Sequence, residues 1–384
     1  MSHSSKIRIG TVLVHSVELV FNFMHFTDGS SPATTSKPIE STLIGQKTCF
    51  HSETWNALRD ELSESQCEQI RAESDCFFKQ GISERLRRKY DIALNTFQQA
   101  LQGYRQVQAC REQGKVLVAM ALTYYNLADY FWAMDYARQG LTIAREVGDR
   151  PMAQQALNHL GNSYRHLGDL SKALSCMDQS LTLARQLEDR QAEMMAFNNL
   201  GIVHKAMGEC QIANEHFQQS LAIAQSLQDR VVEKQVLRNL GNTYHALGNY
   251  RDTIKYYDQL LSIAYETMDC PAISRVLRNL SSACYNLGDY SKAIHYLLQR
   301  LALARKLKDR RIEAQALESL SINYDALGNY TKAVECQEQR LKATLDLQNR
   351  RLQKQALDSL KMACFAIGDF ARVSQYVDMM YDSR

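Results

Sequence analysis

A repeat of forty residues constrains this chain more than any other feature. A glycine between an apolar residue and Asp, Asn or Glu recurs without a gap at Gly168, Gly208, Gly248, Gly288, Gly328 and Gly368. A second marker keeps the same period, an Asp followed by Arg at Asp149, Asp189, Asp229 and Asp309. A fixed period of this length indicates stacked copies of one supersecondary unit rather than ordinary globular domains.

Each copy predicts a helical hairpin. In the third copy the apolar spacing predicts a first helix over residues 152–167 and a second over residues 170–187. Gly168 lies between them, because glycine takes the left-handed conformation that ends a helix without steric cost. Gly161 and Ala173 are small, so we expect the two helices to cross closely there. We call the first helix of each copy helix A and the second helix B.

The composition agrees with an all-α fold. The chain has only four prolines in 384 residues and is 45% hydrophobic, which leaves few helix breakers and ample material for a core. We predict a right-handed superhelical solenoid of about eight hairpins over residues 66–384, with helix A lining a concave groove and helix B facing outward. Residues 1–65 lack the repeat, and we expect a flexible segment with a possible capping helix over residues 53–64.

The repeat resembles the tetratricopeptide family, in a variant with a forty-residue period. The small and aromatic positions of the family are met by Gly161 and Tyr164 in one copy and by Gly241 and Tyr257 in another. The pattern is similar to bacterial arrays, especially cyanobacterial ones, and to the repeats of animal polarity adaptors. The resemblance covers about residues 70–384, and it implies a scaffold or adaptor that binds proteins without naming the partner.

Motifs for catalysis are missing from the sequence. It contains no phosphate-binding loop, no Gly-x-Ser-x-Gly and no His-Glu-x-x-His, and no cysteines stand in the Cys-x-x-Cys spacing. Cys176, Cys284 and Cys336 fall on repeat positions that predict small buried residues, which favours a reducing compartment. We predict no enzyme activity, no catalytic residues, no cofactor and no metal site. The net charge of only +3 gives no general attraction to nucleic acid.

The resemblance also implies which side chains face the groove. They lie two and five residues to either side of the marker leucine of helix A, and we call them the predicted groove positions. Several are amides that can bind a peptide backbone, and the middle copies carry cations while Glu318 and Asp325 follow in a later copy. The alternative is that these positions are simply solvated. The candidate partner-binding residues are Asn158, Asn162, Arg165, Asn198, Lys205, Arg238, Asn242, His245, Arg275 and Arg278.

We therefore predict that the groove binds a peptide or helical segment of a partner protein that carries acidic residues. Two other functions stay open, a regulatory array that docks a separate effector protein and an exported assembly factor for a membrane complex. The apolar run over residues 9–17 follows two cations and resembles a signal peptide, but Glu18 interrupts it. We predict a cytoplasmic protein without stable membrane insertion, with export as the alternative.

The last helix suggests self-association. Residues 370–381 carry an apolar stripe that includes Phe370, Val373 and Val377. In earlier copies this stripe would pack on the next hairpin, so here it predicts a possible homodimer contact. The alternative is that neighbouring polar side chains such as Arg372 cover enough of it.

Overall fold

The computed structural model describes residues 63–382 of the chain. The chain divides into two compact units, the first ending at Val231 and the second beginning at Val232. The flexible segment predicted over residues 1–65 and the capping helix predicted over residues 53–64 lie outside the described residues, apart from their last positions. The boundary predicted at residue 66 therefore stays a prediction.

The described residues contain sixteen α-helices and no strand. In the first unit these are α3 (Glu64–Leu86), α4 (Tyr90–Gln106), α5 (Cys110–Asn126), α6 (Tyr130–Glu146), α7 (Arg150–His166), α8 (Leu170–Gln186), α9 (Arg190–Ala206) and α10 (Cys210–Ser226). Helix α11 (Arg230–Ala246) begins at the boundary, and the second unit continues with α12 (Tyr250–Glu266), α13 (Cys270–Asn286), α14 (Tyr290–Leu307), α15 (Arg310–Ala326), α16 (Tyr330–Asp346), α17 (Arg350–Ala366) and α18 (Phe370–Asp382).

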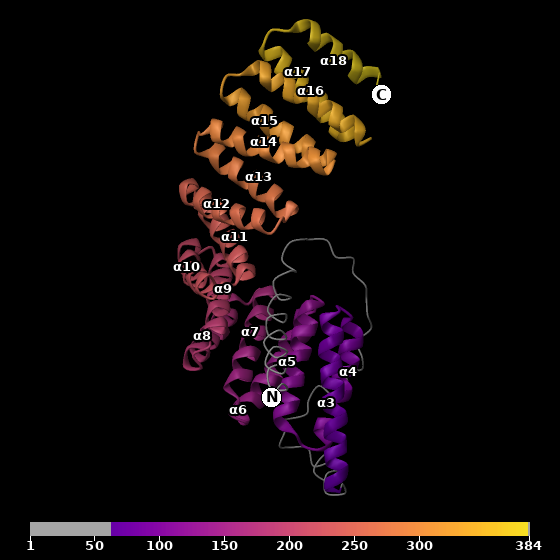
Figure 1. Ribbon diagram of the computed structural model, residues 1–384, viewed down its shortest axis with the longest axis vertical. Helices are drawn as coiled ribbons and strands as arrows, with labels where there is room; N and C mark the ends of the chain where they lie inside the picture. Colours follow the sequence, from indigo (N-terminus) through magenta and orange to yellow (C-terminus); the bar gives the residue numbers. More distant parts are fainter. Residues whose placement is uncertain (1–62, 383–384) are drawn as a thin grey trace, which may run out of the picture. The chain divides into compact units, whose positions relative to one another are not determined.

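These helices form eight consecutive hairpins, which confirms the predicted all-α repeat array. Odd-numbered helices are helix A and even-numbered helices are helix B, and within each unit they stack in chain order (Figure 1). In the first unit, α5 also contacts α3 and α7, so helix A of one hairpin meets helix A of the next. None of the helices in the described part of the chain combines the length and the hydropathy that a membrane-spanning segment requires.

The turns between the described helices all share one backbone conformation. One residue in the left-handed region follows each helix from α3 to α17, and from the third hairpin on a glycine takes that role after helix A, as at Gly168 with φ +86°. Except at Lys89, Ala109 and Glu209, the side chain of the next residue caps the following helix, and the Asp169 carboxylate accepts a hydrogen bond of 3.1 Å from the Lys172 amide. The glycine marker and the acidic residue after it are therefore explained by turn chemistry.

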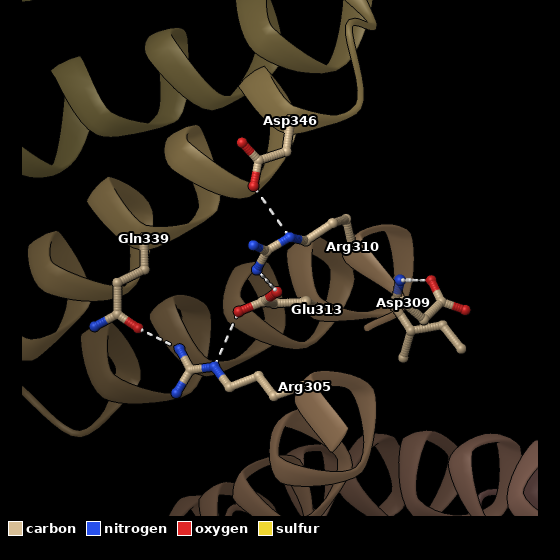
Figure 2. Close-up of polar contacts among 7 residues, drawn as sticks. Arg305, Asp309, Arg310, Glu313, Gln339 and Asp346 are labelled. Atoms are coloured by element: carbon tan, nitrogen blue, oxygen red, sulfur yellow. Dashed lines mark hydrogen bonds and ion pairs between the residues drawn. The ribbon is translucent and has the colours of Figure 1, made fainter. Parts of the chain in front are cut away.

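The Asp-Arg marker is structural as well. The Asp309 carboxylate accepts a hydrogen bond of 2.9 Å from the Ile312 amide, and the Arg310 guanidinium lies 2.7 Å from Glu313 on the same helix (Figure 2). Arg305 reaches Glu313 from α14 at 2.9 Å. Burial would raise the pKa of Glu313, but the two guanidinium groups outweigh burial and hold that pKa below its ordinary value. The pair of Arg305 with Glu313 thus ties helix B of one hairpin to helix A of the next, and Arg310 of the marker shares the same carboxylate.

Helix A and helix B of one hairpin fit together by size. A Cβ added to Gly241 would lie 2.6 Å from the ring of Tyr257, and a Cβ added to Gly201 would lie equally close to Phe217. Where serine replaces the glycine, at Ser281, the residue opposite is Leu297. The predicted close crossing at Gly161 is confirmed, since its Cβ would lie 2.8 Å from the Cε of Met177.

The cysteines on repeat positions that predict a small buried residue behave as predicted. Four are free and buried, and burial raises their thiol pKa: Cys176, Cys284, Cys336 and Cys364.

We expect Gly248→Ala to lower the free energy of unfolding by about 1 kcal/mol, because Gly248 has φ +71° and an L side chain is disfavoured there. The exposed Met268 has φ +50° after helix B, so Met268→Gly should raise the same quantity by about 0.5–1 kcal/mol. Urea unfolding followed by circular dichroism measures both. A neutral Gly248→Ala would show that the left-handed residue does not limit stability.

Candidate partner-binding face

The predicted groove positions of the first unit lie on α7 and α9, and their amides bond to one another. Asn199 donates a hydrogen bond of 2.7 Å from Nδ2 to Oδ1 of Asn158. Asn162 donates from Nδ2 to the Asn158 carbonyl oxygen at 3.1 Å. Asn158 and Asn162 remain half-buried, so part of each amide is open to solvent. Asn199 is buried, and the sequence analysis missed it because it lies one residue from the predicted stripe.

Asn198 departs from the prediction. We expected its side chain to face the groove, but the residue has no exposed surface. Lys205, near the end of α9, is half-buried. The side chains of α9 are thus less open than the spacing alone predicts, because every residue from 193 to 201 is buried among the neighbouring helices.

Arg165 is part of an aromatic cluster rather than a free cation. Its Nη2 donates to Nε2 of His166 at 2.8 Å and approaches the hydroxyl of Tyr125 at 3.5 Å. The ring of Tyr130 stacks on His166 with 4.0 Å between the ring centroids. Burial, followed by the charge of Arg165, lowers the pKa of His166 to about 4, so the imidazole is neutral and accepts a hydrogen bond at neutral pH.

The predicted groove positions of the second unit form a group of cations. Arg275 and Arg278 are exposed on α13, and Arg238 is half-buried on α11. Burial lowers the pKa of Arg238, and the charge of Arg275 adds to the effect, which indicates that the two guanidinium groups are near each other. None of the three forms an ion pair within residues 63–382.

A buried hydroxyl links the two helices that carry these cations. Tyr257 of α12 is 2% exposed, and its hydroxyl donates a hydrogen bond of 2.6 Å to Oδ1 of Asn242 on α11. The same hydroxyl accepts from Nδ2 of Asn279 on α13 at 3.2 Å. The hydroxyl of the buried Tyr257 therefore fixes the orientation of the side chain of Asn242, which is one of the predicted groove positions. His245 is half-buried near the end of α11 and packs edge-on against Tyr250, with 5.4 Å between the ring centroids.

Two buried arginines on helix B were missed by the sequence analysis. Arg300 on α14 and Arg340 on α16 are each 3% exposed and occupy the same repeat position. Forty residues before Arg300 that position holds Leu260, so a cation on an otherwise apolar stripe was the available signal. Both side chains are long enough to extend between helices of neighbouring hairpins.

The two arginines have different partners. Arg340 forms an ion pair of 2.8 Å between its Nη2 and the Oε1 of Glu318 on α15. Arg300 instead donates to neutral oxygens, from Nη2 to Oε1 of Gln315 at 2.8 Å and from Nε to Oγ of Ser274 at 3.3 Å. Burial, followed by the charge of Arg278, lowers the pKa of Arg300 to about 10.

Charge is therefore segregated within the second unit. Helices α11 and α13 present only cations at the charged predicted groove positions, and α15 presents the acids Glu318 and Asp325. The structure adds that Glu318 is paired inside the protein, with Arg340. No cluster of three or more His, Cys, Asp or Glu side chains in the described residues could hold a metal ion.

Helical hairpins that stack within each unit and carry polar side chains along helix A define a helical-repeat scaffold. The family model described as tetratricopeptide repeat matches residues 152–226 and 234–306. The residues that the model matches are tetratricopeptide repeats, as the resemblance implied, and the hairpins on either side of them keep the same fold. Such repeats are typically non-catalytic and bind other proteins, which gives this chain a general protein-binding role.

Two solved structures are similar in fold. The apo form of RapI is 16% identical, with a TM-score of 0.52 over 76% of this chain and 99% of that chain. A signal transduction ATPase with numerous domains and a tetratricopeptide-repeat sensor, from Pyrococcus horikoshii, is 16% identical with a TM-score of 0.58. That match covers 86% of this chain but only 51% of the ATPase, and at this identity it shows the fold alone. A comparison with curated protein sequences finds no significant match.

We expect Glu318→Gln to lower the free energy of unfolding by about 1–2 kcal/mol. The buried Arg340 would lose its carboxylate, and the half-exposed position of Glu318 limits the loss to the lower part of the range for buried pairs. Asp325→Asn on the same helix removes an exposed acid and is the matched control, with an expected change below about 0.5 kcal/mol. Equal effects of the two substitutions in chemical unfolding would contradict the importance of this pair.

Proposed function

We propose that the chain is a non-catalytic scaffold that binds an acidic peptide or helix of a partner protein through helix A of its central hairpins. The observation that carries the proposal is a group of cations on α11, α13 and α14, which we call the basic cluster: Arg238, Arg275, Arg278 and the buried Arg300. None of them has an ion pair within the described residues.

Electrostatics supports an acidic partner. The formal charge of the chain is close to balanced, with 45 Lys and Arg against 42 Asp and Glu, so a group of four cations that form no ion pair within residues 63–382 is a local feature. Burial, followed by the charge of Arg275, lowers the pKa of Arg238, and burial, followed by the charge of Arg278, lowers the pKa of Arg300. A bound carboxylate would relieve both repulsions, and complementary charge of this kind speeds association and selects the partner.

Fixed polar side chains in each unit support a bound peptide. The amide of Asn242 is held by Tyr257, and in the first unit Asn158 and Asn162 are held by amide–amide hydrogen bonds. Side-chain amides that are fixed before binding can donate to and accept from a peptide backbone at a lower entropic cost. We therefore add Asn242 to the proposed partner-binding face of the second unit, and we propose Asn158 and Asn162 as peptide-binding residues of the first unit.

The proposal predicts that Arg238→Glu combined with Arg278→Glu abolishes capture of partner proteins while the helix content stays that of the wild type. Reversing two charges that face the partner lowers both the association rate and the affinity, more strongly at low salt. Capture on the tagged full chain, followed by mass spectrometry, measures the loss. The matched control is Arg251→Glu with Lys306→Glu, which makes the same change of charge at exposed positions of α12 and α14. Capture of the same partners by the cluster variant at low salt would refute the assignment.

We further propose that the chain forms a homodimer through α17 and α18. Phe365 and Phe370 are 59% and 63% exposed and contact each other edge-on, and Met362 is 64% exposed. Large apolar side chains grouped in this way favour an interface. Val373 is less suitable for an interface than the sequence suggested, because it packs against the buried cluster around Leu360 and Tyr376. The side chains of residues 377–382 lie outside those the structure describes.

Phe365→Glu with Phe370→Glu should convert a dimer into a monomer, because each glutamate would have to be buried in the contact. Analytical ultracentrifugation over a range of concentrations measures this, and Tyr265→Glu, at another exposed aromatic, is the control. A wild-type chain that stays monomeric at the highest concentration excludes the dimer.

A further inference from the structure

Arg300 and Arg340 provide an internal comparison, because the repeat places them at the same position one copy apart. Both are 3% exposed, both extend from helix B, and both reach helix A of the next hairpin. Burying a guanidinium group without a compensating negative charge costs several kcal/mol, so each side chain needs strong acceptors. Arg340 has a negatively charged acceptor within the chain, whereas Arg300 has none within hydrogen-bond distance among the described residues.

Around Arg340 the negative charge comes from helix A of its own hairpin. Glu318 is 45% exposed at its side chain, yet its carboxylate lies 2.8 Å from the Nη2 of Arg340. The buried guanidinium group is therefore reachable from the face that carries the predicted groove positions. The other nitrogen, Nη1, donates to Gln337 and to Ser359, both at 3.3 Å.

Next to Arg300, the repeat position that corresponds to Glu318 holds a cation. The residue forty positions before Glu318 is Arg278, which is exposed and whose charge lowers the pKa of Arg300. The acceptors present are the neutral oxygens of Gln315 and Ser274. Asp309 also acts on Arg300 through its charge, but its carboxylate caps α15 through the Ile312 amide and is not hydrogen-bonded to the guanidinium group. Arg300 thus lacks the carboxylate that Arg340 has.

We infer that Arg300 and Arg278 together bind one carboxylate from outside the chain, the side chain of an Asp or Glu on a partner. The ligand carboxylate takes the place that Glu318 occupies one repeat later and lies between the buried and the exposed guanidinium group. This inference rests on the proposed function, and it deepens that proposal by naming the two side chains that bind the partner's carboxylate. A carboxylate is preferred to a phosphate because the equivalent site inside this chain is filled by a planar carboxylate.

The first test needs no partner. Arg278→Glu supplies the missing carboxylate within the chain, and Arg278→Gln removes the same cation without supplying one. We expect the melting temperature of Arg278→Glu to exceed that of Arg278→Gln by about 2–4 °C, and we expect Arg300→Gln in the same background to remove the difference. Equal melting temperatures of the Glu and Gln variants, or a difference that survives Arg300→Gln, would overturn the inference.

The second test uses glutarate as the probe, with inorganic phosphate and chloride at equal ionic strength. Glutarate in excess of its Kd should raise the melting temperature of the wild type by about 2–4 °C over chloride and leave Arg278→Glu unchanged, because its own glutamate fills the site. The same rise in both proteins overturns the inference, and so does a rise with phosphate but not with glutarate. Both readouts are independent of partner capture, so this site and the proposed function can fail separately.

Discussion

The close approach of helix A and helix B within each hairpin is the contact on which the rest of the structure depends. Gly241 leaves room for the ring of Tyr257, and at that distance no side chain larger than hydrogen fits. Where the small residue becomes Ser281, the opposite residue becomes Leu297, so the summed volume stays nearly the same. Because helix A and helix B approach each other in a similar way in every copy, residues forty positions apart occupy equivalent places. This equivalence makes the comparison of Arg300 with Arg340 meaningful.

The same contact positions polar groups for recognition. Tyr257 packs beneath Gly241 and uses its hydroxyl to hold Asn242 and Asn279 on two different A helices. A residue that is required for packing thus also orders part of the proposed partner-binding face. Ion pairs near the turns also join neighbouring hairpins, as the pair of Arg305 with Glu313 joins α14 to α15 (Figure 2). Side chains fixed in this way lose little conformational freedom when a partner binds.

Most of the fold could be predicted from the sequence because its determinants are local. The left-handed glycine at Gly168, the cap at Asp169 and the apolar spacing of α7 and α8 each depend on residues within one hairpin. The candidate face was harder, because exposure on helix A depends on the copies before and after it. Asn198 follows the correct spacing but is buried, whereas Asn199, one residue further, bonds to Asn158 across two hairpins.

Arg300 shows most clearly why spacing alone could not define the binding face. Its repeat position predicts a buried residue, and the residue is indeed buried, but the end of its side chain reaches Gln315 on the next helix A. A long cation that starts in the core of one hairpin can therefore act on the face of its neighbour. The cost of burying that charge makes Arg300 a poor choice for stability alone, because Leu260 fills the equivalent position one copy earlier. Its presence beside Arg278, where the next copy has an acid, is explained most simply if binding a carboxylate stabilises the complex more than an apolar residue stabilises the free protein.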